Sequence, residues 1–546
     1  LRSGRTTDLH DIVVRYAMTA LTLNADGNGE TVSPTVRDCV FEESSNYGLY
    51  VYGYASNAIA SPVVQNTLMM SNTQYGLYAH AYNSDAMASP SLSNCELAYN
   101  GIGAYARADS GRVSTLGLQN IDLHHNTRWP LYFSGNGWFD DLGGVIVHNN
   151  GYAAVGIAGA FYHGRTWTSL QGLPYWMDND VTVSSGVTLT LPAGLVVKAD
   201  SGSDLFVDGL LVLQSSPGNE IVFTSYRDDT YGGDTNGDGV SSAAANDWGS
   251  IVLRGNEFIS FHDAIIRYAN DGLQISAQGT SFSPAIRDND IRFSYGDGIQ
   301  VYATNGIADP TIYNNVLAHN ANGIYVYDGT AGTANPLVYA NDIYSNTNYG
   351  LLNSDTDIVL NAKSNWWGHT SGPHHPTTNP SGQGNQVSDS ADYIPWLRDR
   401  LFLDVTVNAS IALGVIPFTT TLSAEVEGGA APYSYMWDFG DGSPVTNELT
   451  VTHAYVDSGV YNACLTVHSH DGQTATGCTS IDVRSPLQSS IIANPISGVS
   501  PLNVSFQATV SGGISPYTYA WDFDEDGQSD STSQSPSHVF RFPSLV

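Results

Sequence analysis

Apolar positions in roughly the first 400 residues follow a repeat that can be aligned on its prolines. Pro34, Pro62 and Pro90 stand 28 residues apart, and a second series, Pro284, Pro310 and Pro336, has an interval of 26. The second residue after each proline is aliphatic: Val36, Val64, Leu92, Ile286, Ile312 and Val338. The seventh residue is apolar: Phe41, Met69, Leu97, Ile291, Leu317 and Ile343. A single unit cannot bury these residues alone, so the pattern predicts stacked coils of β-strand that share one interior.

Each unit also contains a turn glycine followed by an alternating strand. After Gly48, Leu49 and Val51 are predicted to point inward, so Tyr50 and Tyr52 point outward. The same alternation predicts a surface series of tyrosines: Tyr50, Tyr52, Tyr78, Tyr105, Tyr302, Tyr325 and Tyr327. Sugar rings can stack on aromatic rings presented by a rigid sheet, and we interpret these tyrosines as ligand-binding residues. The alternative is that stacked tyrosines only stabilise the sheet.

The second series carries an amide five residues after each proline. Asn289, Asn315 and Asn341 would lie one strand spacing apart in successive coils, about 4.8 Å. At that spacing their side chains can hydrogen-bond up the column. The asparagines therefore predict coils stacked in register.

The array is duplicated on a larger scale. Residues 9–17 resemble residues 261–269, which lie 252 positions later, and alternating or apolar strand runs fill the middle of the intervening sequence. We predict a first array over residues 1–158, incomplete at its N-terminus. A second array is predicted over residues 159–402, with a leading segment at 173–256.

This pattern resembles the right-handed parallel β-helix proteins of the pectate-lyase-like superfamily, across roughly residues 1–400. The motif Asn-Trp-Trp-Gly at residues 365–368 and the run at 392–396 look like the end of the array in bacterial members. Members of the superfamily include lyases, hydrolases, epimerases, adhesins and copper-site maturation proteins. The resemblance therefore implies a fold without selecting a function.

From about Leu403 the coil pattern stops and alternating strands begin. The motif Tyr-Met-Trp-Asp-Phe-Gly-Asp-Gly at residues 435–442, followed by His453 and Tyr455, is similar to PKD domains. These domains are immunoglobulin-like sandwiches of seven strands. The resemblance predicts a PKD domain over residues 403–485.

A second copy of this pattern begins near Ser489 and includes Tyr-Ala-Trp-Asp-Phe at residues 519–523. We predict a second PKD domain over residues 486–546, truncated because the pattern lacks its last two strands. Such a half-sandwich would expose strand edges. The predicted fold class is therefore all-β: a right-handed parallel β-helix in two consecutive arrays, followed by immunoglobulin-like PKD β-sandwiches.

The four cysteines test this arrangement. Cys464 and Cys478 are equidistant from Asp471, so across a hairpin their Cα atoms would be about 4.5–5.5 Å apart, which a disulfide accepts. Cys39 and Cys95 would lie two coils apart, about 9.6 Å, and could not pair. A disulfide in the sandwich would indicate an oxidising, extracellular setting.

Charge and hydropathy exclude some classes of function. The chain has 52 acidic and 19 basic residues and a formal net charge of −33, so we expect no nucleic-acid partner, because the protein would repel phosphates. No stretch approaches 18 unbroken apolar residues, and no membrane span is expected. The sequence opens at Leu1 in mid-pattern without a signal peptide. An extracellular or cell-surface location is therefore inferred from the predicted disulfide and the lysine-poor, acidic composition.

Two acidic loops have the spacing of calcium ligands. The loop at residues 234–239 places oxygen-bearing side chains at its first, third and fifth positions and a glycine at its sixth. Its twelfth residue is Ala245, so a nearby aspartate would have to close the site. We predict a structural Ca²⁺ bound by Asp228, Asp229, Asp234, Asn236, Asp238 and Asp247. A weaker copy consists of Asp522, Asp524, Asp526, Gly527 and Asp530. The alternative is that both are solvated acidic turns.

Catalytic motifs are sparse. Asp288 and Asp290, with Arg292 beside them, are the candidate catalytic residues, because side chains two apart on a strand lie about 6.6 Å apart, near the separation in inverting glycosidases. Arginine at this position would lower the carboxyl pKa, which disfavours a general acid. The pairs His124-His125 and His374-His375 have metal-binding side chains, but no carboxylate stands at a diagnostic spacing, and adjacent histidines on loops are more often solvated.

We interpret the chain as a secreted or cell-surface β-helix protein. Its rigid surface would bind polysaccharide or another extracellular partner, and the PKD domains would act as spacers. One alternative is a polysaccharide lyase or glycoside hydrolase. The other is a structural stalk or filament subunit that self-associates through the array ends, where unpaired strands are exposed.

Overall fold

The computed structural model of the chain divides into two compact units, Leu1–Asp399 and Arg400–Val546. The structure describes residues 7–83, 85–109, 113–140, 143–255, 259–443, 447–470 and 472–541. The predicted turn residue Asp471 and the outer bounds predicted at residues 1, 256 and 546 lie outside these ranges. Across the described ranges, no helix is long and apolar enough to cross a bilayer.

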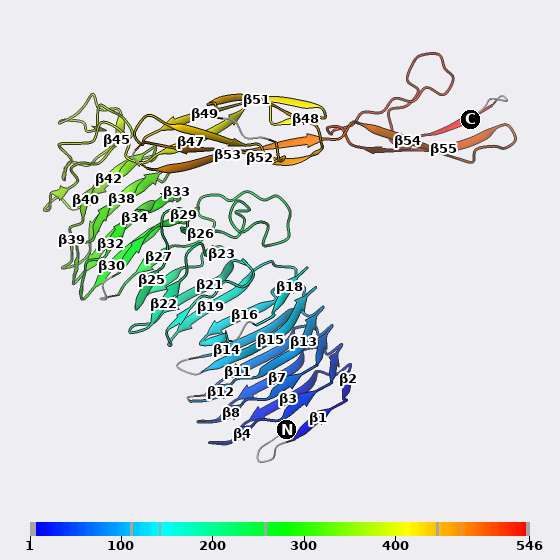
Figure 1. The fold of residues 1–546 in the computed structure, drawn as a ribbon, viewed down its shortest axis with the longest axis horizontal. Helices are drawn as coiled ribbons and strands as arrows, with labels where there is room; N and C mark the ends of the chain where they lie inside the picture. Colours follow the sequence, from blue (N-terminus) through cyan, green and yellow to red (C-terminus); the bar gives the residue numbers. More distant parts are fainter. Residues whose placement is uncertain are drawn as a thin grey trace. The chain divides into compact units, whose positions relative to one another are not determined.

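The first unit is a parallel β-solenoid, in which each strand pairs with the equivalent strands of the coils before and after it (Figure 1). Its longest series of paired strands, the main ladder, runs through both predicted arrays. The main ladder contains β3 (Thr19–Ala25), β7 (Tyr47–Gly53), β11 (Tyr75–Ala81), β14 (Ile102–Ala108), β16 (Leu131–Gly135), β19 (Val155–Phe161), β21 (Tyr175–Val183), β24 (Leu205–Val207), β27 (Ile251–Leu253), β30 (Leu273–Gln278), β34 (Asp297–Thr304), β38 (Asn322–Asp328) and β42 (Tyr349–Asn353).

Further ladders complete each coil. In the N-terminal half they are formed by β1 (Asp8–His10), β5 (Thr35–Arg37), β9 (Val63–Gln65), β13 (Ser91–Ala98), β15 (Ser114–His124) and β17 (Gly137–Asp140), and by β2 (Val13–Arg15), β6 (Val40–Glu42), β10 (Leu68–Met70) and β18 (Ile146–His148). In the C-terminal half they are formed by β23 (Val196–Ala199), β26 (Ile221–Ser225), β29 (Ala264–Arg267), β33 (Asp290–Arg292), β37 (Val316–Ala318) and β41 (Asp342–Tyr344), and by β28 (Ser260–His262), β32 (Ala285–Arg287), β36 (Thr311–Tyr313) and β40 (Leu337–Tyr339).

Short sheets close the corners between these ladders. They are β4 (Thr31–Val32), β8 (Ile59–Ala60) and β12 (Met87–Ala88); β20 (Arg165–Thr166), β22 (Thr188–Leu191) and β25 (Leu210–Leu213); β31 (Ser281–Phe282), β35 (Ile307–Ala308) and β39 (Thr333–Ala334); β43 (Leu360–Asn361) and β46 (Ala391–Asp392); and β44 (Pro373–His374) and β45 (Gly384–Gln386).

The predicted interior columns are confirmed. Val36, Val64 and Leu92 are direct partners on β5, β9 and β13, and none is more than 1% exposed. Ile286 and Ile312 pair in the same way on β32 and β36, fully buried. Because successive side chains of a strand point to opposite faces, this register fixes which residues reach the surface.

The asparagine column is also confirmed. Asn315 donates from Nδ2 to Oδ1 of Asn341 at 2.9 Å and to the carbonyl oxygen of Ile286 at 2.9 Å. Its own Oδ1 accepts from the backbone N–H of Asn289 at 3.1 Å. Each fully buried amide thus ties one coil to the next, as buried polar groups require.

The two predicted arrays are joined by continuous strand pairing. β19 pairs with β21, and the ladder then forks, because residues 175–177 pair with β23 whereas residues 181–183 pair with β24. The duplicated segments hold equivalent places, since Leu9 of β1 pairs with Val36 and Phe261 of β28 pairs with Ile286.

The second unit begins with a sandwich of two sheets. One is three-stranded, formed by β47 (Asp404–Ala409), β49 (Phe418–Glu427) and β51 (Thr450–Tyr455). The other is four-stranded, formed by β48 (Leu413–Val415), β53 (Thr474–Arg484), β52 (Gly459–His468) and β50 (Ser434–Asp438). Leu422 of the first sheet and Trp437 and Leu465 of the second share its core, each fully buried. The predicted immunoglobulin-like sandwich is therefore confirmed.

The cysteines behave as predicted. Cys464 and Cys478 are partners on β52 and β53 and form a disulfide with their Cα atoms 4.1 Å apart. Cys39 and Cys95 are free and buried.

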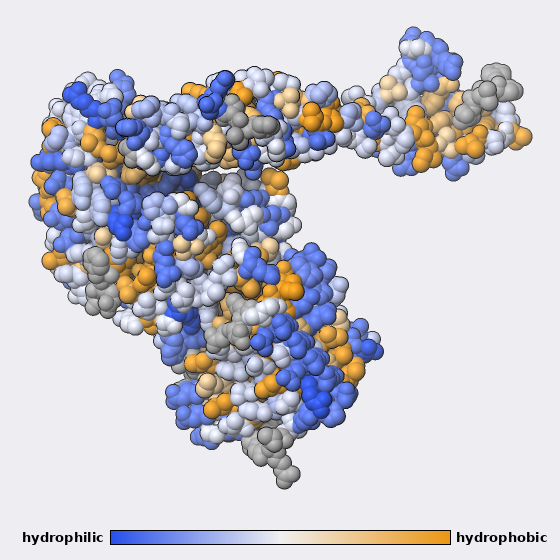
Figure 2. Space-filling model, in the orientation of Figure 1, coloured by the Kyte–Doolittle hydropathy of each residue, from blue (hydrophilic) through white to orange (hydrophobic). Residues whose placement is uncertain are grey.

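A further sheet follows the sandwich. It is three-stranded and antiparallel, formed by β54 (Gln488–Asn494), β55 (Leu502–Ser511) and β56 (Ser537–Phe540). Residues 519–523 form no strand there, since the described residues hold no counterpart of β52, which pairs with β50 in the sandwich. Ile491, Ile492 and Val499 are consequently more than half exposed. Figure 2 shows hydrophobic side chains, in orange, at the surface of this C-terminal part of the chain.

Candidate functional site

The outward tyrosines of the main ladder form columns. Tyr50, Tyr78, Tyr105 and Tyr132 are register partners on β7, β11, β14 and β16. The rings of the first three stack with centroids 5.2 and 5.0 Å apart, whereas Tyr132 meets Tyr105 edge-on at 4.9 Å. Because the coils are about 4.8 Å apart, each ring covers the face of the next, and Tyr78 in the middle of the column is only 8% exposed.

The other predicted binding tyrosines pack in similar contacts. Tyr52 lies against His80 with centroids 5.5 Å apart, and burial raises the pKa of Tyr52 to about 12. Tyr302 and Tyr325 both stack on Tyr327, at 4.6 and 5.0 Å. Ring faces that a sugar could use are therefore found at the ends of the columns rather than along them.

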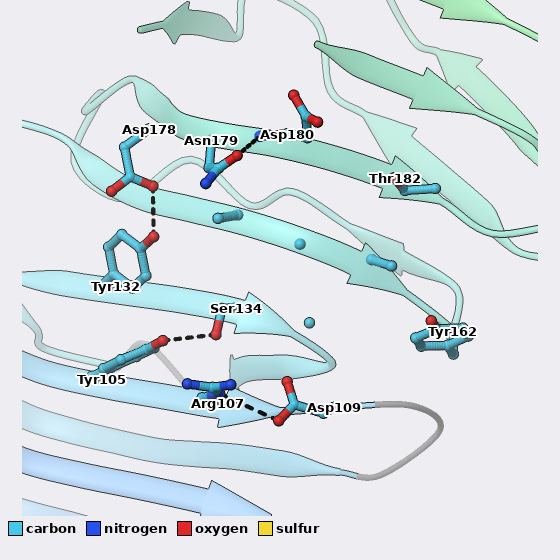
Figure 3. Close-up of a pocket in the computed structure, with 14 residues that line it drawn as sticks. Tyr105, Arg107, Asp109, Tyr132, Ser134, Tyr162, Asp178, Asn179, Asp180 and Thr182 are labelled. Carbon is cyan, nitrogen blue, oxygen red and sulfur yellow. Dashed lines mark hydrogen bonds and ion pairs between the residues drawn. The ribbon is translucent and has the colours of Figure 1, made fainter. Parts of the chain in front are cut away.

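One column ends at a cleft of about 550 Å³ on the outer face of the main ladder (Figure 3). Its floor contains Ala158, Gly159 and Ala160 of β19, which carry no ring that could continue the column. A side chain at Gly156 would come within 2.3 Å of the Tyr132 ring, so the end of the column requires glycine there. The walls include Tyr105, Arg107, Ser134, Tyr162, Asp178 and Asp180.

A bulge in β21 places the acidic wall of the cleft. Met177 pairs with Ile157 and Val181 pairs with Gly159, so residues 178–180 stand opposite the single residue Ala158. The extra residues have no register partners on β19, and Asp180 becomes exposed at the rim. Bulges of this kind redirect side chains and are frequent beside functional sites.

Hydrogen bonds connect the end of the tyrosine column to the bulge. Tyr132 donates from its hydroxyl to Asp178 at 2.5 Å, and the hydroxyls of Tyr105 and Ser134 are 2.8 Å apart (Figure 3). Burial raises the pKa of Asp178, and the hydrogen bond from Tyr132 opposes that rise. Burial and the nearby charge of Asp178 in turn raise the pKa of Tyr132. The cleft therefore holds a half-buried carboxyl bonded to a neutral phenol.

A second, smaller cleft of about 270 Å³ lies further along the same face. Tyr302 and Tyr327 line it together with Gln274 and Gln300, which are register partners on β30 and β34. Of the predicted binding tyrosines, Tyr105 thus lines the large cleft, and Tyr302 and Tyr327 line the small one.

Two carboxyls, the partly buried Asp271 and the buried Asp297, hold the glutamines of the second cleft. Asp271 accepts from Gln274 at 3.0 Å, and Asp297 accepts from Gln300 at 3.1 Å. Asp271 also accepts from the backbone N–H of Asp297 at 2.7 Å. Burial raises the pKa of both carboxyls. The amide groups are therefore fixed in orientation, a requirement for recognising hydroxyl groups of a ligand.

The predicted catalytic residues lie on or beside β33 and line neither cleft. Asp290 is held by Arg267 at 3.1 Å and by Arg292 at 2.7 Å, and Asp288 pairs with Arg287 at 2.6 Å. Each carboxylate is thus neutralised by arginine, and catalysis by these residues stays a prediction.

The first predicted calcium loop is held by hydrogen bonds of its own. Asp234 accepts from the backbone N–H of Gly237 at 2.8 Å, and Asn236 donates to Asp238 at 2.8 Å on an exposed turn. The remaining predicted ligands accept from nearby donors: Asp228 from Thr224 and Thr230, Asp229 from Ser241, and Asp247 from Ala244.

An internal lysine supports the base of this loop. The fully buried Lys198 donates from Nζ to the carbonyl oxygens of Asp228 at 2.9 Å and Gly233 at 2.7 Å. Burial lowers the pKa of Lys198, and the nearby aspartates oppose that shift. A positive charge from the chain itself therefore lies among the predicted ligands.

Comparison with known proteins identifies the sandwich. A family model described as PKD domain matches residues 404–485. This segment is a PKD domain. Among solved structures, the PKD1 domain of the Vibrio cholerae metalloprotease PrtV is 23% identical, with a TM-score of 0.14, over 15% of this chain and 98% of that one. Three N-terminal domains of the outer capsid protein Hoc of bacteriophage RB49 are 22% identical, with a TM-score of 0.18, over 25% of this chain and 48% of that one.

The motif residues of the PKD domain come together around one ring stack. Phe439 stacks on His453 with centroids 3.9 Å apart, and His453 contacts Asp441 at 2.7 Å. Trp437 donates from Nε1 to the carbonyl oxygen of Glu448 at 2.7 Å. A PKD domain with a disulfide fits a protein of the extracellular type.

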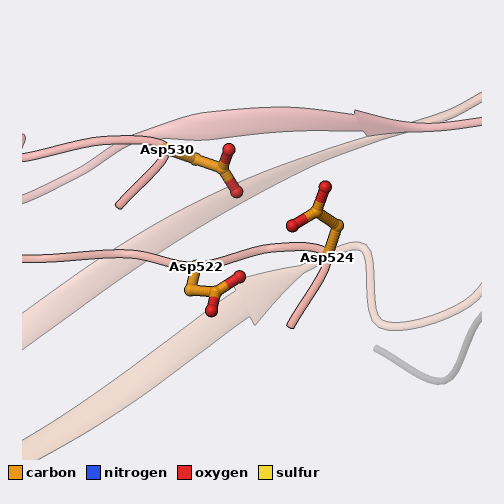
Figure 4. Close-up of side chains that lie close together, drawn as sticks. All are labelled: Asp522, Asp524 and Asp530. Atoms are coloured by element: carbon orange, nitrogen blue, oxygen red, sulfur yellow. The ribbon is translucent and has the colours of Figure 1, made fainter. Parts of the chain in front are cut away.

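The sheet after the PKD domain repeats these contacts. Trp521 donates to the carbonyl oxygen of Ser533 at 2.7 Å, as Trp437 does to Glu448, and Phe523 stacks on His538 at 4.6 Å. Three carboxylates of the weaker predicted calcium loop also converge, each offering an oxygen within 4.8 Å of the others: Asp522, Asp524 and Asp530 (Figure 4).

The acidic wall of the cleft was not predicted from the sequence. The signal was nevertheless present, since Asp178, Asn179 and Asp180 interrupt an apolar strand between Met177 and Val181. Three polar residues in a row cannot all alternate outward, so the chain must bulge there.

Proposed function

We propose that this is an extracellular protein whose main ladder binds polysaccharide along its outer face, with the 550 Å³ cleft as the principal subsite. The PKD domain would act as a spacer. The proposal depends on one observation. A column of tyrosines ends beside the β21 bulge, at a cleft whose floor consists of small residues. Sugar recognition needs an aromatic surface for the C–H face of the ring and fixed polar groups for its hydroxyls, and Tyr105, Tyr162 and Asp178 supply both.

The charge of the face favours neutral or amino-sugar polymers over uronates. Asp178 and Asp180 line the cleft, and the nearest cation there, Arg107, contacts Asp109 at 3.3 Å. Polymers that carry a carboxylate on each sugar would be repelled, because like charges at short range raise the free energy of binding.

A glycan-array screen followed by calorimetric titration of the best ligand tests this function. Tyr162→Ala and Asp180→Ala are expected to weaken binding at least tenfold, because both side chains line the cleft. Tyr54→Ala is the matched control, since Tyr54 is 42% exposed, close to the 43% of Tyr162, and lies outside the cleft. Equal affinity of all three variants and the parent would contradict the proposal.

Polysaccharide cleavage is a second candidate, supported by the raised pKa of Asp178. A carboxyl with a raised pKa is suited to act as a general acid. Release of reducing ends or unsaturated products from the bound glycan, lost in Asp178→Asn, would establish cleavage. Binding without product would leave the protein as a binder.

A further inference from the structure

The two clefts adjoin each other along the main ladder. Thr182 of β21 lines the large cleft, and its direct register partner, Phe206 of β24, lines the small one. Register partners in neighbouring coils lie about 4.8 Å apart, so the last coil of one cleft is next to the first coil of the other. We call the boundary between β21 and β24 the cleft junction. A polymer that occupies both clefts has to cross it.

Two carboxylates at the cleft junction are held in place by the backbone. Asp180 lines the large cleft (Figure 3), and its Oδ1 atom accepts from the backbone N–H of Asp204 at 3.0 Å. Asp204 lines the small cleft, and its Oδ1 atom accepts from the backbone N–H of Ser250 at 2.6 Å. The Oδ2 atoms of both side chains make no hydrogen bond with any residue that the structure describes. Each can therefore accept one from a ligand.

The chain provides no paired cation for these carboxylates. Across the described ranges, neither carboxylate of the cleft junction forms an ion pair. The arginines on either side have partners of their own, since Arg107 contacts Asp109 at 3.3 Å and Arg254 contacts Asp208 at 2.8 Å. The cleft junction therefore carries negative charge that a cationic ligand would neutralise.

The carboxyls are also close enough to repel one another. Burial raises the pKa of Asp204, the charge of Asp180 adds to the rise, and the charge of Arg254 opposes it. Asp178 adds a third carboxyl to the wall of the large cleft. A cation bound beside such a group favours its charged form and relieves the repulsion.

Aromatic rings accompany the carboxylates in both clefts. Tyr162 lines the large cleft and is 43% exposed. Phe206 lines the small cleft, and the guanidinium of Arg254 lies over its ring at 4.1 Å. The clefts thus offer apolar surface for sugar rings on both sides of a negatively charged junction.

We propose that the polysaccharide ligand is a polymer of amino sugars with free ammonium groups, and that the cleft junction binds one of these groups at the carboxylates of Asp180 and Asp204. This inference rests on the polysaccharide-binding function proposed above and names the class of its ligand. An ammonium group has three donors and a positive charge, so it can bond to both free Oδ2 atoms and neutralise the junction. N-acetylated and other neutral sugars lack that charge, and uronates are repelled.

Calorimetric titration of the full chain with a glucosamine hexasaccharide and with its fully N-acetylated counterpart tests the class of ligand. At about pH 6 the free amines are protonated, and we expect the glucosamine hexasaccharide to bind at least tenfold more tightly. Raising the ionic strength from about 0.05 M to about 0.5 M should reduce this preference, because salt screens exposed charges. Pentalysine, a cation without sugar rings, should bind at least tenfold more weakly than the glucosamine hexasaccharide.

Asp180→Asn and Asp204→Asn separate the charge from the fold. Asparagine keeps the Oδ1 acceptor of each hydrogen bond to the backbone and removes the negative charge. Each substitution should weaken binding of the glucosamine hexasaccharide at least fivefold and leave binding of the N-acetylated one unchanged. Asp357→Asn is the matched control, because Asp357 is exposed and lies outside both clefts. It removes the same charge and should leave both affinities unchanged.

The possible failures are distinguishable. Equal affinity for the two hexasaccharides, with both weakened by Tyr162→Ala, would overturn the amino-sugar ligand and leave the polysaccharide function standing. A preference for the glucosamine hexasaccharide that neither aspartate variant reduces, or equally tight binding of pentalysine, would overturn the cleft junction as an amino-sugar site. Absence of binding to any glycan would overturn both proposals.

Discussion

Single buried amides contribute to the register of the solenoid. Each asparagine of the column satisfies a backbone N–H in the coil before it and a carbonyl oxygen as well, and Asn315 shows both contacts. A hydrophobic residue of equal size would fill the space and leave these groups without partners, which is costly in a dry interior. The column could be predicted from the sequence because it repeats with the period of the coil.

Asn315→Ala is expected to lower the free energy of unfolding by about 3 kcal/mol, because it leaves buried backbone groups of two coils unsatisfied. Guanidinium denaturation of the variant and the parent measures the difference. The control is Asn348→Ala, an exposed amide, which should change stability by less than about 0.5 kcal/mol. Equal effects of the two substitutions would contradict the role of the column.

The carboxyls beside the second cleft, Asp271 and Asp297, make stability depend on pH. Burial raises the pKa of Asp271 and Asp297 above the usual 3.8. As the pH rises through this value, the unfolded chain loses these protons before the folded one does, so the free energy of unfolding falls. Asp271→Asn should therefore gain stability relative to the parent between about pH 4 and pH 7. Denaturation midpoints of the variant and the parent at both pH values measure this gain. A difference between variant and parent that is the same at both pH values would refute the prediction.

Among the elements, the regular strands were predicted from the repeat and the bulged one was missed. Val36 and Ile286 follow the repeat, so their places in the coil were read directly from the sequence. The cleft depends instead on β21, where residues 178–180 depart from alternation, and on the small side chains of β19. A repeat pattern carries no information about such departures, which is why the tyrosines were predicted and the acidic wall was missed.

Calcium binding by the two acidic loops stays a prediction. Chelation should lower the unfolding temperature, since an ion at one hundred times its dissociation constant stabilises a fold by about 2.7 kcal/mol. Asp524→Asn should abolish this response in the C-terminal sheet, where Asp522 already accepts from the backbone N–H of Gly527. Asp234→Asn tests the first loop. If calorimetry showed that the chelator shifts no unfolding transition of the parent protein, both calcium sites would be excluded.

At the scale of the whole molecule, the chain combines a stack of coils with a separate antiparallel unit. Contacts in the first unit link each coil to its neighbours, so its stability is close to a sum over adjacent coils. The cleft residues all belong to the first unit, and the disulfide belongs to the second.

The two units should therefore respond separately to reduction. Opening the Cys464–Cys478 bond, which spans 14 residues, is expected to cost a fragment of residues 400–546 about 3 kcal/mol. A fragment of residues 1–399 should be insensitive, because its cysteines are free, and should retain the glycan affinity of the parent. Thermal melts with and without reductant measure the first effect and titration the second. Loss of glycan binding from residues 1–399 would show that the second unit contributes to the site.

The large cleft lies where the ladder forks, between the series of 28-residue units and the series of 26-residue units. Its lining residues come from both predicted arrays, Tyr105 and Tyr132 from the first and Gly159 and Asp178 from the second, so the cleft lies at the seam between them. Substitutions at the seam can alter the preferred ligand without disturbing any repeat, so related proteins with the same coils are expected to diverge most at this junction.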